Sequence, residues 1–237
     1  MNKNAIVVIS LGAAAFLTAL FYIYFRNTDT KAPQDVDTAT QQNADDPMLA
    51  QIEQNAETIL KSGLNENEII YTIKTGEVTY GADKQFLGKD AENVIGTSTD
   101  VQGTGYWNKD TSAIELSAVV NLTGLSTGNS SRDREVQPLF TDKMATFRLE
   151  STQLNIKMGQ NFEQDITGTL IINGISKTVT FKTKGMVTET NFNAEGQSTI
   201  KMSDFGITAP SLAGIYTVAD ELPITFKVSG ESVSPTN

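Results

Sequence analysis

The amino-acid sequence predicts an all-β domain, an eight-stranded antiparallel barrel, preceded by a transmembrane helix, a disordered tether and a short amphipathic helix. From Glu68 onward, apolar and polar residues alternate with a period of two in about eight runs, as strands with one buried face do. The runs are short and evenly spaced with glycine-rich turns between them, which is typical of a sandwich or a barrel. Consecutive hairpins favour the barrel of these two architectures.

The N-terminal segment, residues 1–26, is predicted to be a membrane anchor. The 21 residues from Ala5 to Phe25 carry no charge, and at about 1.5 Å per residue they can cross a hydrocarbon core of roughly 30 Å. A cleaved signal peptide is the alternative because Lys3 precedes the run, but its apolar region is typically only about 7–15 residues long. Cleavage after Ala15 would leave an exposed apolar stretch, so we expect an uncleaved signal anchor.

Two further segments separate this anchor from the barrel. Residues 27–45 are rich in Thr, Gln, Asp and Ala without periodicity, which is typical of a disordered linker. Residues 46–63 begin with Asp46 as an N-cap before Pro47, and their apolar residues recur on one helical face. We expect this helix to pack on the barrel. A dimerising or membrane-surface stripe is the alternative, although its polar face is acidic.

A hairpin centred on Asn173 and Gly174 defines the barrel pattern. Both central residues of a type I′ turn need a positive φ, which Asn and Gly tolerate best. The two-residue loop fixes the register, and the predicted pairs are Ile172 with Ile175, Leu170 with Lys177, Gly168 with Val179, and Ile166 with Phe181. These residues share a largely apolar face that must lie against a second sheet or inside a barrel.

The other strands of the barrel domain, residues 64–232, follow the same pattern. The eight predicted strands span residues 69–79, 94–107, 113–122, 145–154, 166–173, 175–184, 195–202 and 222–229. Residues 123–143 interrupt the meander with a polar loop and a short helix around 132–139. Residues 233–237 are predicted to be a disordered tail.

The apolar faces of these strands supply the candidate lumen residues. They are Ile114, Leu116, Ala118, Val120, Phe147, Leu149, Ile166, Gly168, Leu170, Ile172, Val179, Phe181, Ile224 and Phe226. An eight-stranded barrel is just wide enough for one slim ligand or for its own side chains. Small residues such as Gly168 and Ala118 favour space for a ligand, and a lumen packed with side chains is the alternative.

Three residues, Arg132, Asp133 and Phe140, belong to the loop that we expect over the barrel mouth. Arg132 and Asp133 are either an ion pair that fixes this loop or a freely solvated pair.

The composition excludes most enzyme mechanisms. The chain has no cysteine and no histidine, so it lacks a thiolate nucleophile, the usual general base and the usual metal ligands. Ser198 and Lys201 have the S-x-x-K spacing, but on a strand residues three apart point to opposite faces. With 28 acidic against 18 basic residues, nucleic acid is not an expected partner. We expect no catalytic residues, no metal and no cofactor.

Three blocks of residues resemble the YceI-like family of lipid-binding, lipocalin-like barrels. They are residues 131–140 (SRDREVQPLF), residues 168–181 (GTLIINGISKTVTF), and residues 201–207 (KMSDFGI) with 218–224 (VADELPI). Their order and spacing match the family's Arg-Asp segment, its hairpin, its S-D-[FY]-G-I turn and its final strand. The family's His-Leu after Arg-Asp is replaced by Arg134-Glu135, and its Tyr-Pro by Lys143-Met144, which puts any head-group contact of that histidine in doubt.

The resemblance covers residues 69–232 and implies a barrel that encloses an isoprenoid or another amphiphilic lipid in an exported protein. With the predicted anchor, it suggests a carrier or store of lipid in the bacterial cell membrane, single-pass through residues 5–25, with its barrel on the periplasmic or extracellular side. An anchored structural or protein-binding barrel with a packed lumen is the alternative. Dimerisation is compatible with either function.

Overall fold

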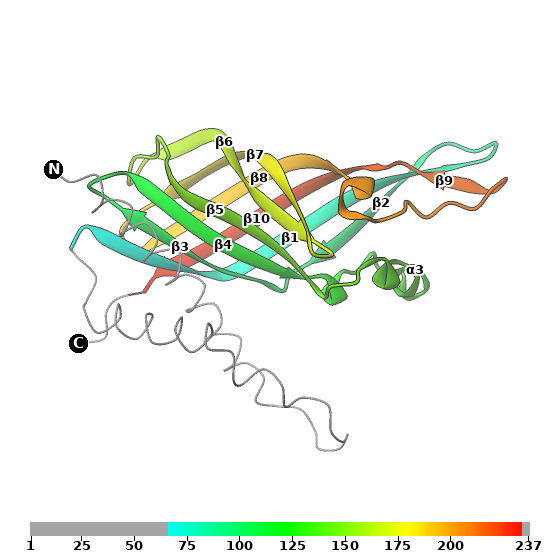
Figure 1. The fold of residues 1–237 in the computed structure, drawn as a ribbon, viewed down its shortest axis with the longest axis horizontal. Coiled ribbons are helices and arrows are strands. Elements are labelled where there is room, and N and C mark those ends of the chain that lie inside the picture. The colour runs from blue at the N-terminus through cyan, green and yellow to red at the C-terminus, as the bar shows by residue number, and fades with distance from the viewer. Residues whose placement is uncertain (1–65, 234–237) are drawn as a thin grey trace, which may run out of the picture.

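The computed structural model describes residues 66–233, in which a single antiparallel sheet closes on itself (Figure 1). Its strands are β1 (Glu68–Phe86), β2 (Glu92–Ser98), β3 (Val101–Asn108), β4 (Ala113–Asn121), β5 (Met144–Gln153), β6 (Asn161–Ile172), β7 (Ile175–Val187), β8 (Asn191–Lys201), β9 (Tyr216–Val218) and β10 (Glu221–Ser232). The helical turns are η1 (Leu122–Gly124), α3 (Ser130–Val136), η2 (Gln137–Leu139) and η3 (Met202–Phe205).

The barrel contains eight strands, as the sequence predicts. Neighbouring strands follow the order β1-β3-β4-β5-β6-β7-β8-β10, and β10 pairs with β1 to complete the ring. This closing pair runs from Tyr71 opposite Ser232 to Tyr80 opposite Ile224. In a closed ring every barrel strand has a paired neighbour on both sides. The ring therefore lacks the fully exposed edge strand at which sheets of different molecules usually aggregate.

Two short strands, β2 and β9, pair with the half of β1 that leads out of the ring, and β9 is absent from the predicted strands. The predicted strand 94–107 is divided at Thr99 and Asp100 into β2 and β3, which pair with different halves of the 19-residue β1. Beyond the barrel, β9 pairs with residues 84–86 of β1. These strands project at the right-hand end of Figure 1 as an arm, here defined as residues 82–95 and 208–218.

The central hairpin has the predicted turn and register. Asn173 and Gly174 have φ values of 53° and 71°, which are the positive values that a type I′ turn requires. Ile172 pairs with Ile175, and the predicted partners of Leu170, Gly168 and Ile166 are all confirmed. The sequence predicts this feature well because the turn chemistry and the period-two pattern agree.

Aromatic side chains cover inward-facing glycines on neighbouring strands. Tyr80 lies opposite Gly96, Phe226 opposite Gly196 and Phe192 opposite Gly230. A methyl group added to any of the three glycines would collide with the facing ring. The glycines therefore make room for large rings inside a strongly curved sheet.

The predicted anchor, linker and helix, residues 1–26, 27–45 and 46–63, lie outside the described residues, as does residue 234 onward. Within residues 66–233, no helix has the length and apolar character needed to cross a bilayer.

Candidate functional site

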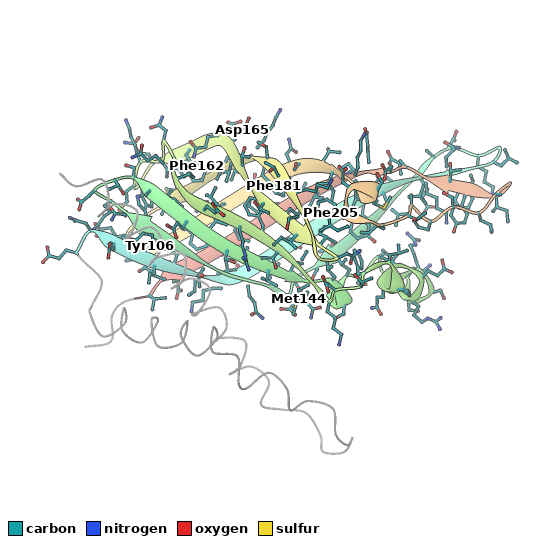
Figure 2. All side chains as sticks on the ribbon, viewed as in Figure 1. Tyr106, Met144, Phe162, Asp165, Phe181 and Phe205 are labelled. Carbon is teal, nitrogen blue, oxygen red and sulfur yellow. The ribbon has the colours of Figure 1, made fainter. Side chains whose placement is uncertain are left out.

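The barrel encloses a cavity of about 380 Å³ that runs from the arm towards the opposite end of the ring. Apolar side chains from every barrel strand dominate its wall. In Figure 2, Phe162 lies near the left end, Phe181 near the middle and Phe205 towards the arm. Ligand-binding cavities in proteins commonly measure about 300–1,000 Å³, so this lumen has the size of a binding site.

A hydrophobic cluster forms the floor of the cavity at the end opposite the arm. Tyr71, Trp107 and Ile156 are its buried members, and Phe162 and Phe192 pack against them. Ile156 comes from the loop between β5 and β6, which folds over this end of the ring. The Tyr71 hydroxyl donates a hydrogen bond of 2.7 Å to the Thr188 carbonyl, which ties β1 to the β7–β8 turn.

Burial of Tyr71 has an electrostatic consequence. Removal of the phenol from water, together with the negative charge of Glu189, raises the pKa of Tyr71 to about 12. The phenol of Tyr71 therefore stays neutral even at a pH at which an ordinary tyrosine ionises. The floor presents apolar surface to anything that enters the lumen.

The charged side chains that line the cavity lie at the mouth, beside the arm. Arg132, Glu135 and Phe140 reach the cavity from α3 and from the residue after η2, while Lys84 and Tyr216 reach it from the arm. The cavity thus joins an apolar floor to a mouth with charged side chains. This polarity matches a molecule with a long apolar part and a polar end.

Most of the predicted lumen residues line this cavity. Those that do are Ile114, Leu116, Ala118, Val120, Phe147, Ile166, Leu170, Ile172, Phe181, Ile224 and Phe226. Leu149 and Val179 are buried but lie outside the cavity wall. Val179 instead belongs to the hydrophobic cluster that surrounds Phe205 of η3.

The expectation that Gly168 leaves a gap in the lumen is wrong. A side chain at this position would collide with the Arg148 carbonyl and the ring of Phe147. Phe147 already occupies the space, and its ring packs edge-on against Phe181 at 5.3 Å between centroids. The glycine accommodates a neighbouring aromatic ring, and the open volume lies elsewhere.

Arg132 and Asp133 have separate partners. Arg132 lies 3.8 Å from the carboxylate of Glu92 on β2, whereas Asp133 accepts hydrogen bonds from the Thr127 amide at 2.9 Å and the Thr127 hydroxyl at 2.6 Å. The Thr127 bonds hold the pKa of Asp133 below its ordinary value. Arg132 lines the cavity and Asp133 does not. Arg132 therefore faces the mouth, whereas Asp133 fixes the loop.

Tyr80 lines the cavity near these loop residues, although the sequence analysis did not select it. Its pKa is raised, first by burial and then by the charge of Asp133, against an opposing effect of Arg132. Strand β1 extends seven residues beyond the predicted end at Thr79, which explains why Tyr80, Ala82 and Lys84 were missed.

Among the described residues, no cluster of three or more acidic side chains has the geometry of a metal site. The carboxylate of Asp220 accepts hydrogen bonds from the Ser203 amide and hydroxyl at 2.8 and 2.6 Å. Its role in the structure is to fix η3.

Comparison with known proteins identifies relatives of this barrel. A family model described as the YceI-like domain matches residues 71–230. Protein YceI of Salmonella arizonae and that of Salmonella agona are each 32% identical over 125 residues, which cover 48% of this chain and 64% of the relative. The match thus spans less than two thirds of the relatives' length. A polyisoprenoid binding domain from Saccharophagus degradans, implicated in plant cell wall breakdown, has a similar fold, with a TM-score of 0.54, 14% identity and coverage of 69% of this chain and 98% of that one.

Proposed function

Since the chain belongs to the YceI-like family, we propose that it is a binding protein that holds an isoprenoid or another amphiphilic lipid in its lumen. The observation that carries the proposal is the cavity of about 380 Å³ with an apolar floor and a charged mouth. Burial of apolar surface favours an alkyl or prenyl chain by roughly 25 cal/mol per Å². The apolar chain of the lipid extends into the lumen towards Trp107, and the polar end of the lipid stays near Lys84 and Arg132.

The similar domain from Saccharophagus degradans is described as polyisoprenoid binding. At 14% identity this likeness supports the fold alone, so the choice of ligand rests on the cavity and on the family. The alternative of a lumen filled by side chains accounts less well for an open volume of this size.

The proposal extends to the N-terminal segment, in which residues 5–25 anchor the chain in a bacterial membrane with the barrel on the periplasmic or extracellular side. The length and uncharged composition of this segment support the anchor. A tethered barrel of this kind carries or stores lipid at the membrane, and binding alone requires no bond to be formed or broken.

The proposal is tested by blocking the lumen with a large side chain. Ala194 on β8 lines the cavity, while its neighbour Asn193 is exposed on the outer face. In protein purified from bacterial membranes and extracted with organic solvent, we expect mass spectrometry to find lipid with the parent chain and with Asn193→Trp, but little with Ala194→Trp. Overpacking typically costs about 1–3 kcal/mol, so melting curves must show that both variants are folded. Equal lipid in both folded variants, or none in the parent chain, would refute lipid binding in the lumen.

A further inference from the structure

The arm exposes an unusual concentration of large apolar side chains at its end. Among the described residues, six large hydrophobic side chains are exposed, and four of them, Leu87, Ile95, Leu212 and Ile215, lie on the arm. Leu87 is 78% exposed, and Leu212 and Ile215 are about half exposed. Folding gains nothing from leaving such side chains in water, and clusters of this kind commonly mark interaction sites.

Three of these residues form one tip. The Leu87 amide donates a hydrogen bond of 3.0 Å to the Ile215 carbonyl, and the Ile215 amide donates one of 2.9 Å to the Leu212 carbonyl. Leu87, Leu212 and Ile215 are therefore fixed side by side, and they are called the apolar tip below. The arm projects from the barrel as a narrow extension (Figure 1), a shape that suits insertion into a soft surface better than docking on a flat one.

Aromatic rings and Lys84 lie directly behind the apolar tip, while a second lysine, Lys89, lies in the β1–β2 turn that follows Leu87. The rings of Phe86 and Tyr216 are 5.8 Å apart, and the Lys84 ammonium lies 3.8 Å from the centroid of Tyr216 and 4.7 Å from that of Phe86. Lys89 approaches Phe86 from the turn at 5.8 Å. Apolar side chains followed by aromatic rings and then by Lys84 follow the order in which proteins meet the hydrocarbon, interface and headgroup levels of a bilayer.

The charges of the arm indicate which surface it binds. Lys84 and Lys89 are accompanied by three acids, Asp83, Asp90 and Glu92. With no excess of positive charge, attraction to anionic lipid contributes little, and insertion depends on the apolar residues. A phospholipid bilayer is therefore a fitting partner whether or not its lipids are anionic.

The apolar tip is continuous with the mouth of the cavity. Lys84 and Tyr216 stand behind the tip and also line the cavity. Insertion of the tip brings the mouth against the lipid surface, so that an apolar chain can pass between bilayer and lumen without crossing water. The arm thus supplies a route for the ligand that the proposed function requires.

The length of chain before the barrel permits this orientation. Glu66 leads into β1 at the end of the barrel opposite the arm (Figure 1). Between residues 5–25 and Glu66 lie the 40 residues from Arg26 to Asn65. They span at most about 140 Å when fully extended, and about 100 Å with residues 46–63 as the predicted helix. A barrel anchored through residues 5–25 can therefore turn its arm towards the same membrane.

We propose that Leu87, Leu212 and Ile215 insert into a phospholipid bilayer and hold the mouth of the barrel against it. The proposal rests on the proposed lipid-binding function, to which it adds the surface where lipid is exchanged.

The absence of cysteine from the chain allows a probe to be placed at a single site. In the full chain reconstituted into phosphatidylcholine vesicles, Ile215→Cys is labelled with a polarity-sensitive fluorophore. Asn155→Cys, in the exposed β5–β6 loop at the opposite end of the barrel, is the matched control. We expect a blue shift and quenching by brominated lipid for residue 215 only, with the same response when phosphatidylglycerol is included. The membrane anchor is common to both chains and does not affect the comparison.

A second measurement separates docking from binding. With Leu87→Asp and Ile215→Asp together, we expect the rate of lipid transfer between vesicles to fall about tenfold or more because two apolar side chains are removed from the bilayer contact. The amount of lipid bound in the lumen should stay unchanged. If the fluorophore at residue 215 shows neither a blue shift nor quenching by brominated lipid, the docking proposal is overturned. This result is expected if the tip binds a protein. In that case, loss of bound lipid from the Ala194→Trp variant would still support the separate proposal that the lumen binds lipid.

Discussion

Asn173 connects three loops near the mouth of the barrel through one amide side chain. Its carbonyl oxygen accepts a hydrogen bond of 2.8 Å from the Thr141 amide, and its nitrogen donates to the carbonyls of Leu139 and Phe205 at 3.2 and 3.4 Å. The residue therefore does more than provide a positive φ for the hairpin turn. It fastens η2 and η3 to the tip of the β6–β7 hairpin.

Replacement of Asn173 by glycine separates these two roles. Glycine accepts the positive φ without strain, so the turn should persist while the hydrogen bonds to Thr141, Leu139 and Phe205 are lost. We expect Asn173→Gly to lower the free energy of unfolding by about 1–3 kcal/mol, measured by urea denaturation. Asn155→Gly, in an exposed loop, is the control for the effect of glycine on the unfolded chain, and an equal loss in both variants would contradict the connecting role.

At the scale of elements, η3 occupies the place where β7 and β8 cease to pair. The β7–β8 ladder ends at Lys182 opposite Gln197, and Phe205 of η3, only 1% exposed, packs against the hydrophobic cluster beside it. Gly206 ends the turn with a φ of 69°, a value that favours glycine. The S-D-F-G-I block is thus a plug in the barrel wall, and its aspartate, Asp204, lies 3.6 Å from the Lys177 ammonium on β7.

The plug is held by Asp220, which gives it a defined dependence on pH. The hydrogen bonds from the Ser203 hydroxyl and amide lower the pKa of Asp220 below its ordinary value. A carboxyl whose pKa is lower in the folded state contributes stability that is present above its unfolded pKa of about 4 and is lost as the pH falls through the folded value.

We therefore expect Asp220→Asn to lower the melting temperature at pH 7 and to have progressively less effect as the pH falls below about 4. Melting curves followed by circular dichroism between pH 7 and pH 3 measure the difference. Asp90→Asn, in the exposed β1–β2 turn, is the control. A constant difference between Asp220→Asn and the parent chain across this range would show that charge on Asp220 is unimportant.

At the scale of the whole molecule, the sequence predicts the ring better than it predicts the volume inside it. The turn at Asn173 and the period-two pattern are local signals, and both the eight strands and the hairpin register follow from them. The course of the cavity depends on how side chains of distant strands share space. Gly168 illustrates this, because the ring that fills its gap comes from β5.

The arm illustrates the second limit of sequence-based prediction. The last residues of β1, 84–86, pair with β9, which lies more than 120 residues later in the chain. Three residues such as Tyr216–Val218 carry too short a pattern to be recognised as a strand. The mouth residues Lys84 and Tyr216 were missed for this reason. Arg132 and Phe140 were found because their loop lies within a recognisable block of sequence.

Closure of the ring within residues 66–233 leads to a prediction about the folding unit. Every barrel strand has both of its ring neighbours within residues 66–233, from the β1–β3 ladder at Glu68 to the β1–β10 ladder at Ser232. A chain that begins at Asn65 therefore contains every strand of the barrel, and we expect it to be soluble, with a strand-type circular dichroism spectrum and a single cooperative melt.

A chain that begins at Asp46 provides the comparison, because it adds the segment predicted to form an amphipathic helix. If both chains melt at similar temperatures and retain the same lipid, residues 46–63 are part of the tether and leave the barrel free to turn its arm towards the membrane. If only the longer chain is soluble, the segment contributes to the core, and the length of chain available for reorientation is reduced to the residues before Asp46. The two chains thus test the folding unit and also the reach on which docking of the apolar tip depends.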